Sequence, residues 1–108
     1  MILLALGAAC GADGGACPAD LPETCGVAPS WQAEVAPIVS RACAPCHGPG
    51  GVEAARPLAA YADVYARRRD VLDQVYSCLM PQQGSGVALS AGEQDALLHW
   101  LVCGAPDN

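Results

Sequence analysis

Two cysteines three residues apart, with a histidine directly behind the second, constrain this chain more than any other feature of its sequence. Cys43, Cys46 and His47 end a run in which apolar residues recur at helical spacing. On a helix, residues i and i+3 share one face, with about 5–6 Å between their Cβ atoms, and residue i+4 lies on the same face. Two sulfur atoms and one imidazole should therefore project together from a single turn.

This C-x-x-C-H spacing is the attachment signature of c-type haem, in which the thiols bond the vinyl groups and the imidazole coordinates iron. A structural zinc site usually needs four ligands, commonly from two cysteine pairs, and no second C-x-x-C is present. A thioredoxin-like dithiol would accompany a βαβ pattern, which is missing. An ordinary disulfide is a further alternative. We predict one covalent haem c.

The composition fits a small domain that needs help to stay folded. With 108 residues, no Phe, two Trp and three Tyr, the core of a single domain lacks bulk, which a cofactor or crosslinks would supply. The 11 acidic residues exceed the five basic ones, all of them Arg, and this balance argues against a nucleic-acid ligand.

The first 29 residues indicate export. Residues 1–10, MILLALGAAC, form an apolar run that is too short to span a bilayer and that resembles the remnant of a signal or lipoprotein segment. Cys10 at its end is a candidate for lipidation, and so for a membrane anchor. Seven cysteines indicate an oxidising compartment, so we expect a periplasmic protein or an outer-membrane-anchored lipoprotein of a bacterial cell envelope. Residues 11–29, rich in Gly, Pro and Ala, are predicted to be a flexible tether.

From Ser30 onward the pattern is helical, and no stretch alternates for long enough to indicate a sheet. We predict an all-α fold of about three to five short helices over 30–47, 59–77 and 90–104. Pro37 should either begin or bend the first of them, while Ser90 with Glu93 forms a capping box and Gly104 ends the last. The positions expected to face inward are Trp31, Val35, Ile38, Val39, Ala42, Tyr61, Val64, Tyr65, Leu72, Val75, Tyr76, Leu97, Leu98, Trp100 and Leu101.

Met80 is the candidate for the second axial ligand of the iron. It is the only methionine apart from Met1, and Pro81 directly after it should break the helix and let the sulfur turn inward. A lone methionine more often fills a core, but with a haem upstream we predict that Met80 binds the iron. His99 falls opposite the apolar stripe of its helix and is expected to pair with Asp95 instead.

Together these residues resemble a class I-type monohaem cytochrome c, similar to small secreted or lipoprotein cytochrome c domains of myxobacteria and planctomycetes. The segments VAPIVSRACAPCHGPGG, RPLAAY, YSCLMP and LSAGEQDALLHWLVCGAP carry the resemblance, over about residues 30 to 106 of a domain at 30–108. The resemblance implies the cytochrome c fold, with the Trp31–Ala42 segment crossing the last helix at Ala96 and Trp100.

The resemblance also assigns roles around the haem. The backbone carbonyl of Pro57 would accept a hydrogen bond from His47, and Leu58 would pack on the haem. Arg56 is a candidate for a haem propionate or for an exposed ion pair.

Four cysteines remain once the haem and Cys10 are accounted for. We predict a Cys78–Cys103 disulfide, which would hold the segment before Met80 against the last helix. Cys17 and Cys25 are then the remaining pair.

The expected function is that of a one-electron carrier rather than an enzyme: a monomer with His/Met-ligated haem that exchanges electrons with redox partner proteins of the envelope. The alternatives are a haem-based peroxidase or gas sensor with a labile Met80, and a haem-free extracellular module stapled by disulfides. The cluster Arg67–Arg69 is interpreted as a solvated helix face or as a docking patch for an acidic partner.

Overall fold

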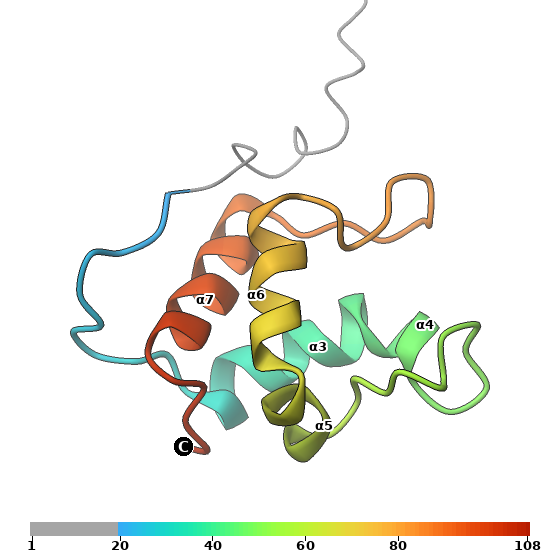
Figure 1. Cartoon of the computed structure of the whole chain (residues 1–108), viewed down its shortest axis with the longest axis horizontal. Helices are drawn as coiled ribbons and strands as arrows, with labels where there is room; N and C mark the ends of the chain where they lie inside the picture. The colour runs from blue at the N-terminus through green and yellow to red at the C-terminus, as the bar shows by residue number, and fades with distance from the viewer. Residues whose placement is uncertain (1–19) are drawn as a thin grey trace, which may run out of the picture.

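Five short α-helices and one π-helical turn make up the regular structure of residues 20–108, the part of the chain that this computed structural model describes (Figure 1). No strand occurs in that range, so the all-α prediction is confirmed for it. Cys10, Cys17 and the predicted segment 1–10 lie outside the described residues. Between residues 20 and 108, none of the helices has the length and apolarity that crossing a bilayer requires.

The predicted helix through the cysteine motif is three consecutive pieces. They are η1 (Trp31–Val35), α3 (Ala36–Ala42) and α4 (Ala44–His47). In η1 the backbone N–H groups reach back five residues, from Val35 to the Ser30 carbonyl at 3.0 Å and from Ala36 to that of Trp31. Pro37 lies in the first turn of α3, where its missing N–H group costs no hydrogen bond.

The predicted helix over 59–77 is divided in the same way. It consists of α5 (Tyr61–Ala66) and α6 (Arg68–Tyr76), which are separated at Arg67 because that residue has non-helical backbone angles of φ −110° and ψ 19°. The last helix, α7 (Ala91–Val102), has the predicted capping box, with Glu93 N donating to Ser90 Oγ at 3.1 Å. Gly104 follows α7 with φ +91°, as expected for a stop signal.

The core lies where α6 and η1 pack against α7 (Figure 1). Trp100 is fully buried, and its ring centroid lies 5.3 Å from that of Trp31, so the first helical segment does meet the last helix. Most positions expected to face inward are buried or half-buried. The prediction that Tyr65 faces inward is wrong, because this residue is 39% exposed. Its ring stacks on that of Tyr61, with 5.7 Å between the two ring centroids. Val71, which was not predicted, is buried.

The disulfide pairing predicted from the sequence is wrong. Cys25 is bonded to Cys103, and this bond excludes both Cys78–Cys103 and Cys17–Cys25. Cys78 is itself disulfide-bonded. The segment at 20–29, part of the predicted tether, has no helix or strand but is fastened to the end of α7 through Cys25.

Candidate functional site

A cavity of about 390 Å³ is lined by residues of α4 and of the loop after α6, among others. Figure 1 shows these two segments on the same side of the fold. This volume is within the range of about 300–1,000 Å³ that is usual for small-molecule sites. Most of its wall is apolar, with α3, α6 and α7 all contributing. The apolar lining includes Ala42, Leu58, Val71, Val75, Leu89 and Leu97.

The cysteine motif lies in the wall of this cavity. Cys43, Cys46 and His47 all line it, as the helical spacing predicted. The N–H groups of Cys46 and His47 donate to the Cys43 carbonyl at 3.2 and 2.9 Å, which keeps the three residues on one turn even though α3 and α4 are separate helices. Both cysteines are free thiols.

Burial changes the acidity of one thiol of the motif, that of Cys43. Burial raises the pKa of Cys43 to about 11, and the nearby Arg41 guanidinium offsets only part of that effect. Cys43 also packs against the hydrophobic core. It is therefore a protonated, weakly nucleophilic thiol near neutral pH.

His47 is oriented by the loop that follows it. Its Nδ1 lies 2.7 Å from the backbone carbonyl oxygen of Arg56, which can only accept, so Nδ1 carries a proton and the neutral tautomer has its lone pair on Nε2. The N–H group of Leu58 donates to the carbonyl of His47 at 3.0 Å and holds the loop against the motif. The carbonyl that accepts the hydrogen bond from His47 therefore belongs to Arg56 and not to the predicted Pro57. Leu58 lines the cavity, whereas Pro57 does not.

Met80 lines the same cavity from the loop after α6, together with Pro81. Its backbone N–H donates to the carbonyl of Gln74 at 3.1 Å, so the chain turns back on the end of α6 instead of running away from it. The cavity therefore collects every residue that the sequence indicated as a haem ligand. Nothing in the spacing of Met80 alone shows this, because the residue lies 33 positions after His47.

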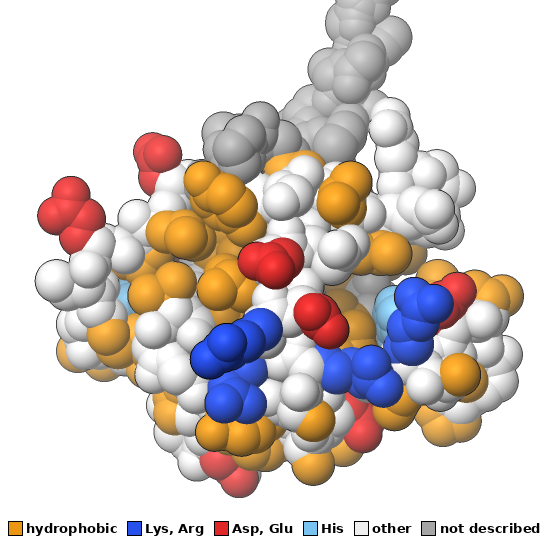
Figure 2. All heavy atoms as spheres, in the orientation of Figure 1, with side chains coloured by type: hydrophobic (Ala, Val, Ile, Leu, Met, Phe, Trp, Pro, Cys, Tyr) orange, Lys and Arg blue, Asp and Glu red, His pale blue; other side chains and the backbone are white. Residues whose placement is uncertain are grey.

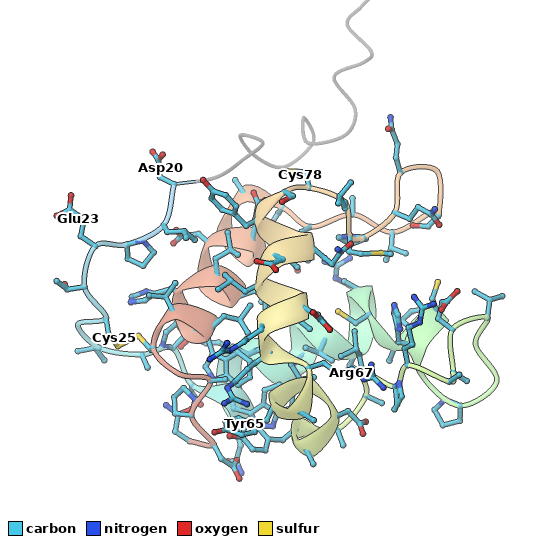
Figure 3. The ribbon with its side chains drawn as sticks, in the orientation of Figure 1. Asp20, Glu23, Cys25, Tyr65, Arg67 and Cys78 are labelled. Carbon is cyan, nitrogen blue, oxygen red and sulfur yellow. A yellow bond between two sulfur atoms is a disulfide. The ribbon has the colours of Figure 1, made fainter. Side chains whose placement is uncertain are left out.

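Charged side chains stand among the apolar lining. Arg56, Glu53, Arg67 and Asp70 all line the cavity, and Arg67 is labelled near the foot of α6 in Figure 3. On the face seen in Figure 2, arginine side chains lie in a row across the lower half, with acidic side chains next to them. This face consequently offers guanidinium groups for carboxylates, but it is not a patch of one charge sign.

The arginine cluster is not a uniform surface. Arg67 lines the cavity, whereas Arg68 donates to the Tyr65 carbonyl at 2.9 Å and lies over the Tyr65 ring, 4.0 Å from its centroid. The docking role suggested for Arg67–Arg69 stays a prediction.

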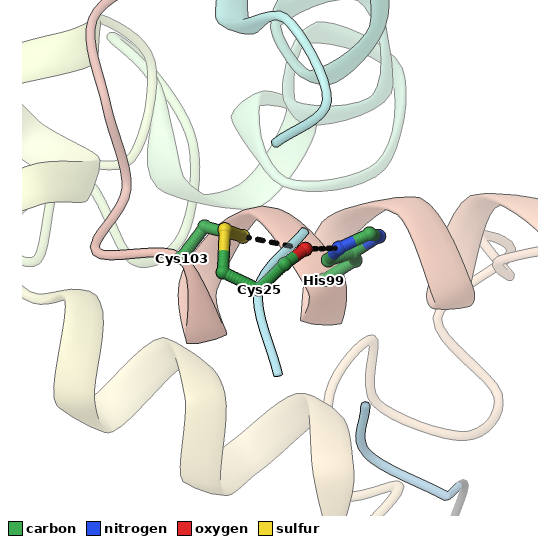
Figure 4. Close-up of side chains that lie close together, drawn as sticks. All are labelled: Cys25, His99 and Cys103. Carbon is green, nitrogen blue, oxygen red and sulfur yellow. Dashed lines mark hydrogen bonds between the residues drawn. A yellow bond between two sulfur atoms is a disulfide. The ribbon is translucent and has the colours of Figure 1, made fainter. Parts of the chain in front are cut away.

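A second group of potential ligand atoms lies at the far end of α7. The sulfur atoms of Cys25 and Cys103 and a ring nitrogen of His99 are within 4.8 Å of one another (Figure 4). The two sulfurs are bonded to each other, so they offer no thiolate to a metal ion. His99 Nε2 contacts the Cys25 carbonyl at 2.5 Å, which gives it a different partner from the predicted Asp95. His99 does not line the cavity.

Comparisons with protein-family models, with curated proteins and with solved structures find no match for this chain. The function therefore has to be argued from the site itself.

Sequence reasoning missed the contribution of α6 to the site. Arg67, Val71 and Gln74 line the cavity beside the predicted Val75. Their spacing of three to four residues was a usable signal, since it places them on one face of the helix. That face was not connected with the cysteine motif because the two segments are far apart in the sequence.

Proposed function

We propose that this chain is a c-type cytochrome that carries single electrons. One haem would be bonded to the thiols of Cys43 and Cys46, with His47 and Met80 as the axial ligands. The observation that carries the proposal is that these four residues line one cavity, although Met80 comes from a different part of the chain. No other purpose accounts as simply for two free thiols, an imidazole and a thioether around an apolar space.

The residues of the cavity fit a haem by their chemistry. The bond from His47 Nδ1 to the Arg56 carbonyl fixes the ring tautomer and leaves Nε2 as the ligand atom, which is how a metal-binding histidine is usually held. The apolar walls from α3, α6 and α7 would exclude water, and a Met ligand raises the reduction potential. When bound, the haem would supply the one-electron chemistry itself.

Two arginines suit the carboxylates of such a group. Arg56 lines the cavity from the loop after α4, and Arg67 lines it from the junction between α5 and α6. Guanidinium groups bind carboxylates through paired N–H donors and stay charged at all physiological pH values. We infer that they would neutralise the haem propionates.

Electron transfer is favoured over peroxide chemistry by the residues around Met80. The loop that carries Met80 also contributes Pro81, Gln82 and Ser85 to the lining of the cavity, and none of these three exchanges a proton near neutral pH. A peroxidase needs a general acid–base group at that position. The protein would therefore pass electrons between redox partner proteins without transforming a substrate.

An extracytoplasmic location fits the cysteine chemistry. The Cys25–Cys103 disulfide is of a kind that persists in oxidising compartments. We propose the bacterial cell envelope as the site of action, with Cys10 as a candidate lipid anchor.

The test is the intact mass of the chain after expression in a host that has cytochrome c maturation machinery. We expect the mass to increase by that of one haem, and the double variant C43A/C46A to lack this increase. Ferric wild-type protein should show the absorption band of a sulfur-to-iron bond, and M80A should lose this band while keeping the covalent haem. Wild-type protein with the mass of the bare polypeptide would overturn the proposal and leave a haem-free disulfide module.

A further inference from the structure

The turn that carries Met80 has a defined hydrogen-bond pattern. The N–H of Cys78 donates to the Val75 carbonyl at 3.1 Å, and the N–H of Leu79 donates to the Gln74 carbonyl at 2.9 Å. These two bonds are those of a Schellman motif, in which the residue at the position of Cys78 is left-handed and is usually glycine. The direction in which Met80 leaves α6 is therefore set by the conformation of Cys78.

Cys78 is an unfavourable residue for that position. Its φ is +61°, where a side chain crowds the backbone. A residue persists in such a conformation only when its surroundings hold it there. Cys78 is labelled beside the end of α6 in Figure 3. It is held through its side chain, because it is disulfide-bonded and because its sulfur also accepts a hydrogen bond from α7.

The donor of that bond is Gln94. It is 8% exposed and is the one buried polar or charged residue among residues 20–108. Its Nε2 donates to the Val75 carbonyl at 3.4 Å and to the Cys78 sulfur at 3.7 Å. Burying an amide group is unfavourable unless it forms hydrogen bonds, and the amide of Gln94 donates to the turn before Met80. Gln94 does not itself line the cavity.

We propose that Gln94 is a positioning residue for the axial methionine, and that it sets how firmly Met80 is held in the cavity. It acts through the Cys78 turn, by tying the last turn of α6 to α7. The inference rests on the proposed function, because the held group is a ligand only if a haem is present. The rival interpretation is that Gln94 merely stabilises the core.

Binding of imidazole to the ferric protein separates the two interpretations. Imidazole has to displace Met80, so its apparent affinity rises with the fraction of molecules in which the turn is open. Loss of the two Gln94 hydrogen bonds in Q94L should raise that affinity about fivefold to tenfold, as expected for a net loss of one or two bonds.

The matched control is L98A on the same helix. Leu98 is 1% exposed, does not line the cavity and has no polar side-chain atom, so its truncation lowers the stability of the core without removing a hydrogen bond from the Cys78 turn. We expect L98A to lower the melting temperature at least as much as Q94L, with imidazole affinity within twofold of wild type. If L98A raises the affinity as much as Q94L, or if Q94L matches wild type, the positioning role is wrong.

Hydrogen exchange gives a readout that does not depend on the iron. The amides of Leu79 and Met80 both donate to the Gln74 carbonyl. They should exchange about fivefold faster or more in Q94L than in wild type, and no faster in L98A. Wild-type protein without haem would contradict the proposed function. Haem-loaded protein in which the Leu79 and Met80 amides exchange at the same rate in Q94L as in wild type would contradict only this inference.

Discussion

The Nδ1 atom of His47 lies 2.7 Å from the backbone carbonyl oxygen of Arg56, nine residues further along the chain. The loop after His47 therefore folds back so that its Arg56 carbonyl contacts the His47 ring and fixes the orientation of the imidazole. The path of this loop depends on a close approach, in which the N–H of Glu53 donates to the Cys46 carbonyl at 2.7 Å. Gly51 is the residue that permits this approach.

Replacing Gly51 by alanine should disrupt the loop. A Cβ atom at this position would lie 2.3 Å from the backbone oxygen of Cys46, which is rigid backbone and cannot swing aside. We expect G51A to lower the free energy of unfolding by about 1–3 kcal/mol, as overpacking typically does. The control is G92A in α7, where the added Cβ meets nothing within 4 Å and helix propensity favours alanine. Denaturant unfolding measures both, and equal stability of the two variants would contradict the argument.

The thiol of Cys43 should react slowly with alkylating agents in the folded, haem-free chain. Burial raises its pKa from the ordinary 9.0 to about 11, so the fraction of reactive thiolate at pH 8 falls about a hundredfold. We expect iodoacetamide to label Cys43 about a hundredfold more slowly in buffer than in urea, in a C46S background read by mass spectrometry. Equal rates in the two solvents would show that Cys43 is not buried.

The sequence alone brought out the residues that we propose as haem ligands, whereas it did not show which residues orient them. Cys43, Cys46 and His47 are read from one turn of helix, and Met80 follows from being the only internal methionine. The acceptor of the His47 proton is different, because its identity depends on the register of a loop. A shift of one residue separates the predicted Pro57 from the observed Arg56.

The cysteine pairing failed for a related physical reason. Periodicity predicts helices, but residues 20–29 have none, so their path over the molecule is not written in a repeat. Only the folded chain shows that this segment brings Cys25 beside Cys103, with a Cα–Cα distance of 5.0 Å. Gln94 was overlooked because a polar residue on a helix is normally solvated, and its burial depends on where α6 ends.

Removal of the Cys25–Cys103 disulfide should destabilise the domain without reducing the attachment of haem to the folded chain. The bond joins residues 78 positions apart, and closing so long a loop is worth about 4.5 kcal/mol in the chain-entropy model. We expect C25A/C103A to lose about 2–4 kcal/mol in urea unfolding, because measured values usually fall below that limit. Neither cysteine lines the cavity, so the yield of covalent haem per folded molecule should stay at the wild-type level. A variant that folds but takes up no haem would contradict this separation.

Acid should weaken the contact between α3 and α7 through Glu93. This residue closes the capping box of α7 and also forms an ion pair with Arg41, whose guanidinium in addition donates to the Ala88 carbonyl at 3.2 Å. The backbone N–H of Ser90, and to a lesser extent Arg41, lower the pKa of Glu93 below its ordinary 4.5.

Because the folded-state pKa is the lower one, the stability that the Glu93 carboxylate contributes is present above pH 4.5 and is lost as the pH falls through the folded value. The variant E93Q keeps a side chain that suits a capping box but has no charge for Arg41. We expect E93Q to be less stable than wild type by about 0.5–1 kcal/mol at pH 7, the usual size for a partly exposed ion pair. In urea titrations the difference should shrink toward zero as the pH falls from 4.5 through the lowered folded-state pKa of Glu93, while E23Q at an exposed position shows no difference at pH 7. A gap between E93Q and wild type that stays constant from pH 7 to pH 3 would mean that the carboxylate charge is not what ties α3 to α7.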